Sequence, residues 1–334
     1  MQQTINIAFS FDDKFADVFC VAACSAAKNT ASNLAIYIVD CGISDENKEK
    51  ILRLREKCPS ITGVKIGAPK RIDVLEKFHM ASHFSPAVFY RLAIPKVFPE
   101  LERVIYVDCD VVVDGDIVEL WREDLASRPF GAIEEEGNFF NPKMRMQKVK
   151  TLSMPAENHY YNSGVLLIDC SKFEESRIFE RVIECVRCTK IFLPCTEQDA
   201  MNICLKNDEH MPLSPRYNFC PSAPLARKTF RRNRNVVIVH YSMCKPWLTN
   251  ERILAALYSI GMFRYSTSFL LKFWQYANEF GFKRTHGKSV SYTFLFLYKR
   301  IFQPIERFVS EKIRDNVLDF FRKHFRNKAS CRIK

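Results

Sequence analysis

Short apolar runs alternate with helical patterns over the first 125 residues, and this alternation limits the possible folds more than any other feature of the chain. Strand–helix alternation predicts an α/β fold whose sheet has substantial parallel character. The expected strands, including those further along the chain, are 5–11, 34–39, 63–66, 103–107, 130–133, 164–169 and 236–241. The expected helices are 14–28, 45–57 (with Ser44 as its N-cap), 173–188 and 197–206.

Acidic residues follow two of the expected strands. Asp12 and Asp13 come after the first strand, and Asp108 and Asp110 come after the strand 103–107. Open α/β sheets bind ligands in the crevice beyond the carboxyl ends of their strands. These positions therefore predict a nucleotide site at that edge of the sheet.

The segment 104–113, VIYVDCDVVV, places two carboxylates one residue apart in an otherwise apolar run. Ionised carboxylates are costly in such surroundings unless they are paired or bound to a metal. They suit Mg²⁺ or Mn²⁺, which can also bind a diphosphate, and the imidazole of His240 could be a third ligand. The alternatives are a solvated acidic turn and a structural histidine at the end of a strand. Lys245 could neutralise a phosphate, or it could be a surface lysine.

Several short motifs occur in order along residues 4–250. They are FSFDD at 9–13, FYRL at 89–92, YVDCD at 106–110, YNSGVLL at 161–167, EQD at 197–199, and HY at 240–241 followed by KPW at 245–247. The ordered set resembles glycosyltransferase family 8, in particular the bacterial lipopolysaccharide galactosyl- and glucosyltransferases. The resemblance implies a GT-A fold, which is a Rossmann-like nucleotide-sugar fold with a mixed sheet flanked by helices. It also implies a UDP-sugar donor, Mn²⁺ (or Mg²⁺) as cofactor, and retention of the sugar's anomeric configuration.

The same resemblance implies roles for individual residues, by their position in the motifs. The implied metal ligands are Asp108, Asp110 and His240. The implied substrate-binding residues at the uridine and ribose are Ser10, Asp12 and Lys14. Arg91 is implied at the donor's phosphate or sugar, Lys245 at the diphosphate, and Cys109 between the metal ligands. Around the transferred sugar, the resemblance implies Glu134 or Glu135 with Asn162 and Gln198. The implied catalytic residues are Gln198 and Asp199.

The implied reaction moves galactose or glucose from the UDP-sugar to a glycan or glycolipid acceptor, in the synthesis of lipopolysaccharide or another cell-surface polysaccharide. Retention leaves two routes open. Gln198 or Asp199 could act as a nucleophile, or the acceptor could attack on the face from which UDP leaves, and we favour the second route.

Two other enzyme classes are alternatives. A haloacid-dehalogenase-type phosphatase has a nucleophile strand that residues 107–112 resemble, but after Gly115-Asp116, which adjoins that strand, no later Gly-Asp or Asp-Asp element completes its Mg²⁺ site. A sugar nucleotidyltransferase would need a glycine-rich phosphate loop near the N-terminus, and that loop is missing.

Positive charge is concentrated in the last quarter of this 334-residue chain. Residues 251–334 contain 17 Lys and Arg against 6 Asp and Glu, whereas residues 1–250 contain 33 against 32. The segments 263–282 and 305–325 also have the spacing of amphipathic helices. We therefore expect a catalytic GT-A domain over 1–250 and a basic, aromatic helical region over 251–334. A basic amphipathic helix suits an anionic membrane surface better than nucleic acid, and a helical subdomain that caps the catalytic core is the alternative.

The cysteines and the N-terminus indicate the compartment. The 13 cysteines are an odd number scattered through expected core elements, and Cys20 and Cys24 lie four apart on an expected helix, which favours reduced thiols. Cys185 and Cys188 are interpreted as two cysteines on a helix face rather than as a zinc site. No secretory signal pattern precedes the first strand, and no apolar stretch reaches the ~18 residues of a membrane span. The sequence predicts a cytoplasmic protein that associates with the inner face of the plasma membrane.

Overall fold

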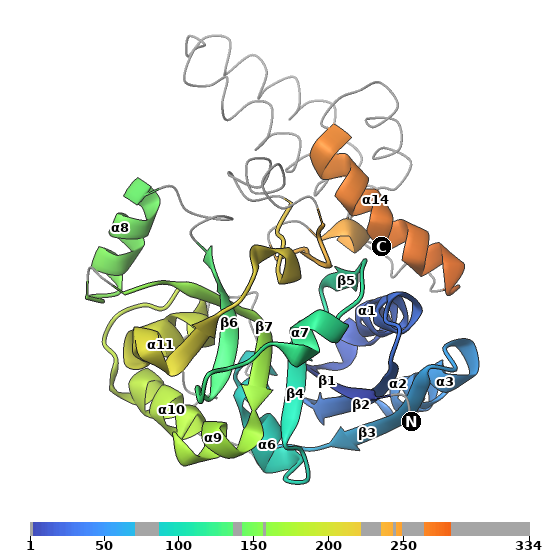
Figure 1. Cartoon of the computed structure of the whole chain (residues 1–334), viewed down its shortest axis with the longest axis horizontal. Coiled ribbons are helices and arrows are strands. Elements are labelled where there is room, and N and C mark those ends of the chain that lie inside the picture. Colours follow the sequence, from blue (N-terminus) through green and yellow to red (C-terminus); the bar gives the residue numbers. More distant parts are fainter. Residues whose placement is uncertain are drawn as a thin grey trace, which may run out of the picture.

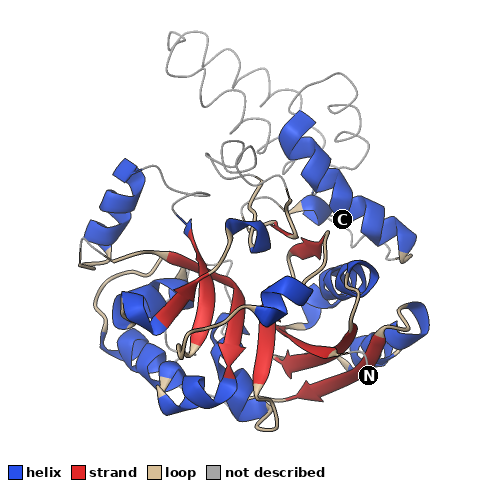
Figure 2. Cartoon of the chain, in the orientation of Figure 1, coloured by secondary structure: helices blue, strands red, loops and turns tan. Residues whose placement is uncertain are grey.

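The computed structural model describes residues 3–70, 87–135, 142–155, 158–221, 235–242, 245–248 and 264–281. Within these residues, helices flank both faces of a central sheet (Figures 1 and 2). This is the α/β class that the strand–helix alternation predicts. The expected helix 305–325 lies outside the described residues.

Within the described ranges, seven strands form the central sheet, in the order β3-β2-β1-β4-β7-β6-β8. Their bounds are Thr4–Phe11 (β1), Asn33–Asp40 (β2), Ile61–Gly67 (β3), Arg103–Val107 (β4), Phe130–Glu134 (β6), Tyr161–Asp169 (β7) and His210–Pro212 (β8). β7 is antiparallel to both of its neighbours, and the other neighbouring strands pair in parallel, so the sheet is mixed, as expected. A second sheet pairs β5 (Val111–Val113) antiparallel with β9 (Ile238–His240).

Helices connect the strands. The α-helices are α1 (Ala16–Asn29), α2 (Asp45–Leu52), α3 (Leu54–Lys57), α5 (Ala87–Tyr90), α6 (Ile94–Val97), α7 (Val118–Arg122), α8 (Pro142–Thr151), α9 (Cys170–Glu175), α10 (Ile178–Cys188), α11 (Thr196–Cys204) and α14 (Arg264–Glu279). The 3₁₀ helices are η1 (Asp13–Phe15), η2 (Arg91–Ala93), η4 (Asn207–Glu209), η5 (Pro215–Tyr217) and η6 (Pro246–Leu248).

Two of the expected helices are each divided in two. The segment 45–57 forms α2 and α3, which meet at Arg53, and Ser44 caps α2 by accepting a backbone N–H hydrogen bond, as expected. The segment 173–188 forms α9 and α10, because Arg177 has a left-handed backbone (φ 51°), which ends an α-helix. The apolar spacing does not reveal this break, since hydrophobic side chains on both sides of it pack into the same cluster.

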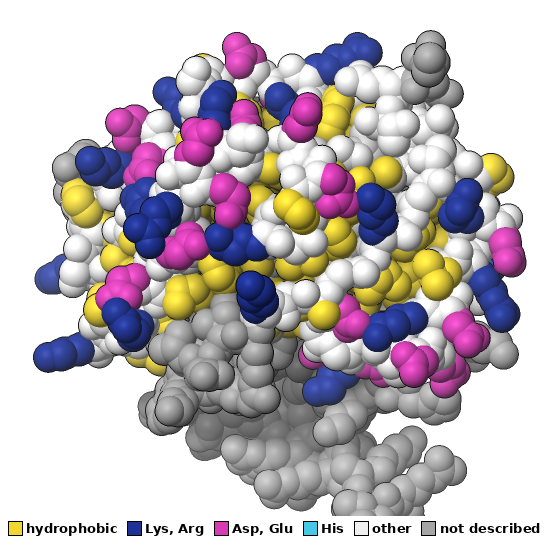
Figure 3. All heavy atoms as spheres, turned by 90° about the horizontal axis from the view of Figure 1, so that it is seen from below, with side chains coloured by type: hydrophobic (Ala, Val, Ile, Leu, Met, Phe, Trp, Pro, Cys, Tyr) yellow, Lys and Arg dark blue, Asp and Glu magenta, His cyan; other side chains and the backbone are white. Residues whose placement is uncertain are grey.

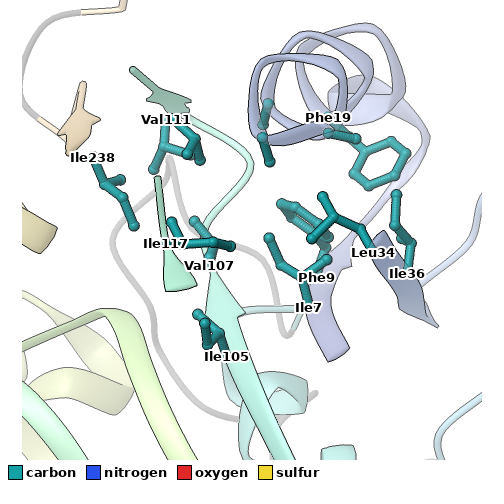
Figure 4. Packing of buried hydrophobic residues seen from close by; sticks show 14 of the residues in the cluster. Ile7, Phe9, Phe19, Leu34, Ile36, Ile105, Val107, Val111, Ile117 and Ile238 are labelled. Carbon is teal, nitrogen blue, oxygen red and sulfur yellow. The ribbon is translucent and has the colours of Figure 1, made fainter. Parts of the chain in front are cut away.

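Hydrophobic clusters cover both faces of the sheet. Alternate residues of β1, such as Ile7 and Phe9, point toward α1, where Figure 4 shows them near Phe19. On the other face, Tyr106 of β4 and Phe130 of β6 belong to a second cluster with residues of α9, α10 and α11. This packing holds the strands in register and so fixes where each strand ends.

The cysteines behave as small apolar side chains. Cys20 and Cys24 are completely buried in α1. Cys185 is half-buried and Cys188 is exposed on α10. All eleven cysteines within the described residues are free thiols, as the sequence predicts.

Helix α14, which lies in the basic C-terminal region, packs beside α1 and β5 (Figure 1). Its Phe273 and Trp274 are almost completely buried there. Tyr276 donates a hydrogen bond to Asp114 Oδ1 at 3.0 Å, and Lys272 pairs with the same carboxylate. The first of the two expected amphipathic helices therefore forms, and its apolar side covers α1 and β5.

The surface carries both signs of charge. On the face shown in Figure 3, Lys and Arg side chains are interspersed with Asp and Glu. This mixture agrees with the near-neutral balance of residues 1–250. Across the described ranges, no helix combines the length and the apolar character that crossing a bilayer requires.

Candidate active site

The connectivity of the central sheet gathers polar residues at one edge. The parallel strands β1 and β4 end at this edge, and the antiparallel strand β7 begins there. Because Val107 of β4 pairs with Val165 of β7, the segment Asn162–Gly164 extends past the end of β4 and lies beside Asp108. The backbone N–H of Asp108 donates to the carbonyl of Gly164 at 2.8 Å.

The structure brings together the three residues expected as metal ligands. Asp108, Asp110 and His240 each offer a ligand atom, and these atoms lie within 4.8 Å of one another. The β5–β9 sheet produces this arrangement, because it pairs Val111 with His240 and lets Tyr241 N–H donate to the carbonyl of Asp110 at 2.8 Å. His240 Nε2 lies 3.2 Å from Asp110 Oδ1 and 3.7 Å from Asp108 Oδ2.

This donor set fits a divalent cation. Two carboxylates supply hard oxygen ligands, and an imidazole nitrogen is compatible with Mn²⁺ and other first-row ions. Burial alone would raise the pKa of Asp110, but Lys245 and His240 lie close enough to outweigh burial and to hold that pKa below its ordinary value. Asp110 is therefore ionised and able to bind a cation.

Gly164 leaves the space that this cluster needs. A Cβ atom at this position would lie 2.4 Å from His240 Cε1 and 2.8 Å from Asp108 Oδ2. Both contacts are too short for a carbon atom, so any larger residue would displace one of the two expected ligands. The glycine of the YNSG motif is thus required by the close approach of β7 to the cluster.

Arg91 is buried beneath Asp108. Its Nη1 lies 3.0 Å from Asp108 Oδ1 and donates to the carbonyl of Ser163 at 3.0 Å, and its Nη2 lies 3.4 Å from Glu197 Oε1. Burial opposes the charge of Arg91, but the two carboxylates raise its pKa above the ordinary value. Tyr106 OH also donates to Asp108 Oδ1 at 2.6 Å. Arg91, expected at the donor's phosphate or sugar, is placed where it fixes the position of Asp108.

A group of buried polar side chains, formed by Glu135, Asn162 and Gln198, adjoins the cluster. Asn162 Nδ2 donates to Glu135 Oε1 and to Gln198 Oε1, both at 2.9 Å, and Gln198 Nε2 donates to Glu135 Oε1 at 3.1 Å. Burial raises the pKa of Glu135, although the amide donors oppose this effect. Of the two glutamates expected at the sugar, Glu135 belongs to this group. Glu134 is half-buried and lies 3.1 Å from His159 Nδ1.

Asp199 lies behind this group, and contacts engage both of its carboxylate oxygens. Oδ1 accepts a hydrogen bond from Tyr160 OH at 2.5 Å and lies 2.9 Å from Lys148 Nζ, whereas Oδ2 accepts from Cys195 N–H at 2.6 Å. Gln198 Nε2 in turn donates to Tyr160 OH at 2.9 Å. The completely buried Asp199 therefore anchors Tyr160 and, through it, Gln198.

The residues expected at the uridine and ribose lie at the end of β1, next to β4 in the sheet. Ser10 Oγ donates to the carbonyl of Ala87 at 3.0 Å, and Asp12 Oδ1 accepts from the N–H of Lys14 at 3.2 Å. Cys109 is buried in a hydrophobic cluster, and burial raises the pKa of its thiol well above the ordinary value. A ligand at this edge would therefore meet the backbone of Cys109 rather than its thiol.

The sequence analysis missed residues that connect these groups. Asn218 lies between Asn162 and His240, at hydrogen-bond distances of 2.7 and 2.8 Å. Lys148 and Tyr160 contact the buried carboxylate of Asp199. An asparagine after a turn or a lysine on a helix is common, so no local pattern marks these positions. The tertiary fold alone brings them to this edge of the sheet.

Comparisons with known proteins agree with this geometry. The sequence profile described as Glycosyl transferase family 8 matches residues 6–251. General stress protein A of Bacillus subtilis (strain 168) is 31% identical over an alignment of 239 residues, and the alignment covers 65% of this chain and 77% of that protein. Lipopolysaccharide 1,2-glucosyltransferase of Escherichia coli (strain K12) is 28% identical over an alignment of 257 residues, and the alignment covers 73% of each chain. The crystal structure of galactosyltransferase LgtC with donor and acceptor sugar analogs shares the fold, with a TM-score of 0.66, 23% identity, and coverage of 82% of this chain and 96% of LgtC.

Proposed function

The chain belongs to glycosyl transferase family 8, and from this premise we propose that it transfers galactose or glucose from a UDP-sugar to a glycan or glycolipid acceptor, with retention of configuration. The observation that carries the proposal is the position of the Asp108, Asp110 and His240 cluster beside the buried group that contains Asn162 and Gln198. The first can hold a cation for a diphosphate, and the second can hydrogen-bond to sugar hydroxyls. The diphosphate and the sugar of a nucleotide-sugar thus each have chemically suitable partners.

The order of the strands suggests how the donor lies. In our proposal the nucleoside lies at the end of β1, where Ser10, Asp12 and Lys14 are found. The diphosphate lies over the end of β4, and the sugar lies toward the start of β7 and the end of β6. Because these strands are neighbours in the sheet, one extended donor molecule can reach all three positions.

We propose that Asp108, Asp110 and His240 hold Mn²⁺ or Mg²⁺. When bound, the cation supplies Lewis acidity toward the diphosphate. Arg91 keeps Asp108 in place, and Lys245, which pairs with Asp110, can direct its ammonium group to a diphosphate oxygen. Fixed positive charge at this position stabilises the negative charge that develops on the departing UDP.

For the reaction itself, we propose attack by the acceptor hydroxyl on the face from which UDP leaves. The bond between the anomeric carbon and UDP breaks as the new glycosidic bond forms, and the hydroxyl proton passes to the departing phosphate. Asp199 is poorly suited to act as a nucleophile, because it is completely buried and three groups engage its two oxygens. Its proposed part is to hold Tyr160, and thereby Gln198, which orients the sugar.

The acceptor and the place of action are also proposals. A relative named lipopolysaccharide 1,2-glucosyltransferase favours a lipid-linked glycan acceptor. Residues 282–334 contain 14 Lys and Arg against 4 Asp and Glu. A segment with this excess of positive charge is attracted to an anionic leaflet, so we propose that the enzyme acts at the cytoplasmic face of the plasma membrane. Nucleic acid is not an expected partner.

A panel of UDP-sugars tests the proposed donor and stereochemistry. We expect Mn²⁺-dependent release of UDP from UDP-galactose or UDP-glucose, and an early product in which NMR shows the α configuration of the donor. A β-linked early product would contradict retention, and a lack of release from every UDP-sugar would contradict the donor class. Hydrolysis of simple phosphomonoesters at a comparable rate would support the phosphatase alternative instead.

A further inference from the structure

Asn218, which the proposed mechanism does not use, lies between the expected sugar group and the expected metal ligands. It is almost completely buried, as are Asn162 and His240 on either side of it. Heavy-atom positions alone do not distinguish the oxygen from the nitrogen of a side-chain amide. The direction of the hydrogen bonds must therefore be deduced from a neighbour that can only donate.

The backbone of β7 supplies that neighbour. Gly164 N–H donates at 2.8 Å to the side chain of Asn162, so the atom of Asn162 that faces it must be the oxygen Oδ1. A second contact agrees. Ser163 N–H donates at 3.2 Å to the side chain of Gln198, so the atom that accepts is the oxygen Oε1. This oxygen lies 2.9 Å from the other amide atom of Asn162, which must be a donor and is therefore Nδ2. Two backbone donors thus give the same orientation for Asn162.

The orientation of Asn162 determines that of Asn218. Asn162 Oδ1 lies 2.7 Å from the side chain of Asn218, and an oxygen acceptor requires a donor there, so this atom of Asn218 is Nδ2. The remaining amide atom of Asn218 is Oδ1, which lies 2.8 Å from His240 Nδ1. Because Oδ1 has no hydrogen to donate, Nδ1 of His240 must carry one.

We propose that Asn218 is a positioning residue that keeps a proton on Nδ1 of His240 and so leaves Nε2 as the ring nitrogen that faces the metal site. Nε2 is the atom that lies 3.2 Å from Asp110 Oδ1 and 3.7 Å from Asp108 Oδ2. A histidine ligand whose second nitrogen donates to a fixed acceptor is oriented in advance and is more basic toward the metal. The part of this inference that concerns metal binding rests on the proposed function, whereas the proton on Nδ1 does not.

The protonation of Nδ1 can be measured directly, without metal or substrate. Long-range ¹H–¹⁵N NMR spectra of the full chain with ¹⁵N-labelled histidine separate protonated from unprotonated ring nitrogens, and a His240→Gln spectrum identifies the signals of His240. At about pH 8 we expect the wild type to show a protonated Nδ1. A wild-type spectrum with an unprotonated Nδ1 would overturn the proposal, and this test needs no variant of Asn218.

Variants of Asn218 test the cause. In Asn218→Leu, which has the same branched shape but no acceptor, we expect a smaller fraction of His240 to carry a proton on Nδ1 and the Kd for Mn²⁺ to rise about 10- to 100-fold. Asn218→Asp loses the donor to Asn162 Oδ1 but keeps an acceptor opposite Nδ1 of His240, so Nδ1 should stay protonated, and this variant serves as the test if Asn218→Leu does not fold. An unchanged protonation of Nδ1 and an unchanged Kd in Asn218→Leu, or an unprotonated Nδ1 in Asn218→Asp, would overturn the role of Asn218. Failure of the enzyme to use any UDP-sugar, with Nδ1 protonated as expected, would contradict only the proposed function.

Discussion

At the scale of single residues, Gly164 illustrates how the lack of a side chain shapes the site. A Cβ at this position would lie 2.4 Å from His240 Cε1, so we expect Gly164→Ala to displace His240 and to raise the Kd for Mn²⁺ by at least about tenfold. The matched control is Gly63→Ala, because a Cβ at Gly63 meets no atom within 4 Å. Calorimetric titration with Mn²⁺ compares the two variants. Equal affinities would contradict the proposed set of ligands.

His210 makes the folded protein sensitive to acid. Its ring is buried against Phe130 and Tyr161, and neither ring nitrogen has a hydrogen-bond partner of normal geometry in the described part of the chain. Burial lowers the pKa of His210 from 6.5 to about 4. As the pH falls below 6.5, the unfolded chain therefore binds a proton before the folded chain does, and stability is lost progressively until the pH reaches about 4.

Replacing His210 should remove this part of the pH dependence. Between pH 7 and pH 5, we expect the unfolding free energy of the wild type to fall by about 2 kcal/mol relative to that of His210→Leu, from the difference between the two pKa values. Equilibrium urea denaturation of both proteins at the two pH values measures this change. If the difference between the two proteins is the same at both pH values, His210 does not titrate as described.

The residues predicted without the family resemblance are those that break a local pattern. Asp108 and Asp110 interrupt an apolar run, and His240 ends one, so the local sequence alone marks each as a candidate functional residue. Asn218 breaks no such pattern, since an asparagine after a turn is ordinary, and its role depends on contacts with β7 and β9. The same holds for Lys148, whose buried partner lies on another helix.

At the scale of secondary-structure elements, α14 supports the segment that carries His240. Tyr241 OH donates to the carbonyl of Phe269 at 2.7 Å, and the ring of Phe273 packs against that of Trp247. Phe273 is 3% exposed, and we expect Phe273→Ala to lower the unfolding free energy by about 3–5 kcal/mol.

Phe192 offers a matched control for Phe273, because its side chain is 60% exposed. Phe192→Ala should change the unfolding free energy by no more than about 0.5 kcal/mol. Equilibrium urea denaturation gives both values. Similar small losses in the two variants would show that α14 does not pack on the body of the protein.

Elements were predictable where the apolar pattern was long enough. The runs that form β1, β2 and β4 are visible in the sequence because each alternates with a helix and is buried in the sheet. β5 and β8 have three residues each, which is too short for a periodic signal. The division between α9 and α10 depends on the backbone conformation of Arg177, which hydrophobic spacing does not report.

At the scale of the whole molecule, the basic C-terminal region extends beyond α14. Residues 282–334 carry most of the excess positive charge, so we expect a chain that ends at residue 281 to keep hydrolysis of the UDP-sugar but to lose binding to anionic liposomes. Sedimentation with liposomes, at low and high salt, measures the binding of both chains. Liposomes of neutral lipid are the control. Equal sedimentation of the shortened and full chains would contradict a role of this segment at the membrane.

The central proposal, cation-dependent sugar transfer at Asp108, Asp110 and His240, is tested most directly by UDP release in the presence and absence of Mn²⁺. We expect excess EDTA to abolish release, added Mn²⁺ to restore it, and Asp110→Asn to lower kcat/KM by at least about 100-fold. Glu100→Gln, which changes an exposed carboxylate paired with Lys65, should have wild-type activity. Full activity in excess EDTA, or an Asp110→Asn enzyme as active as Glu100→Gln, would contradict the proposal.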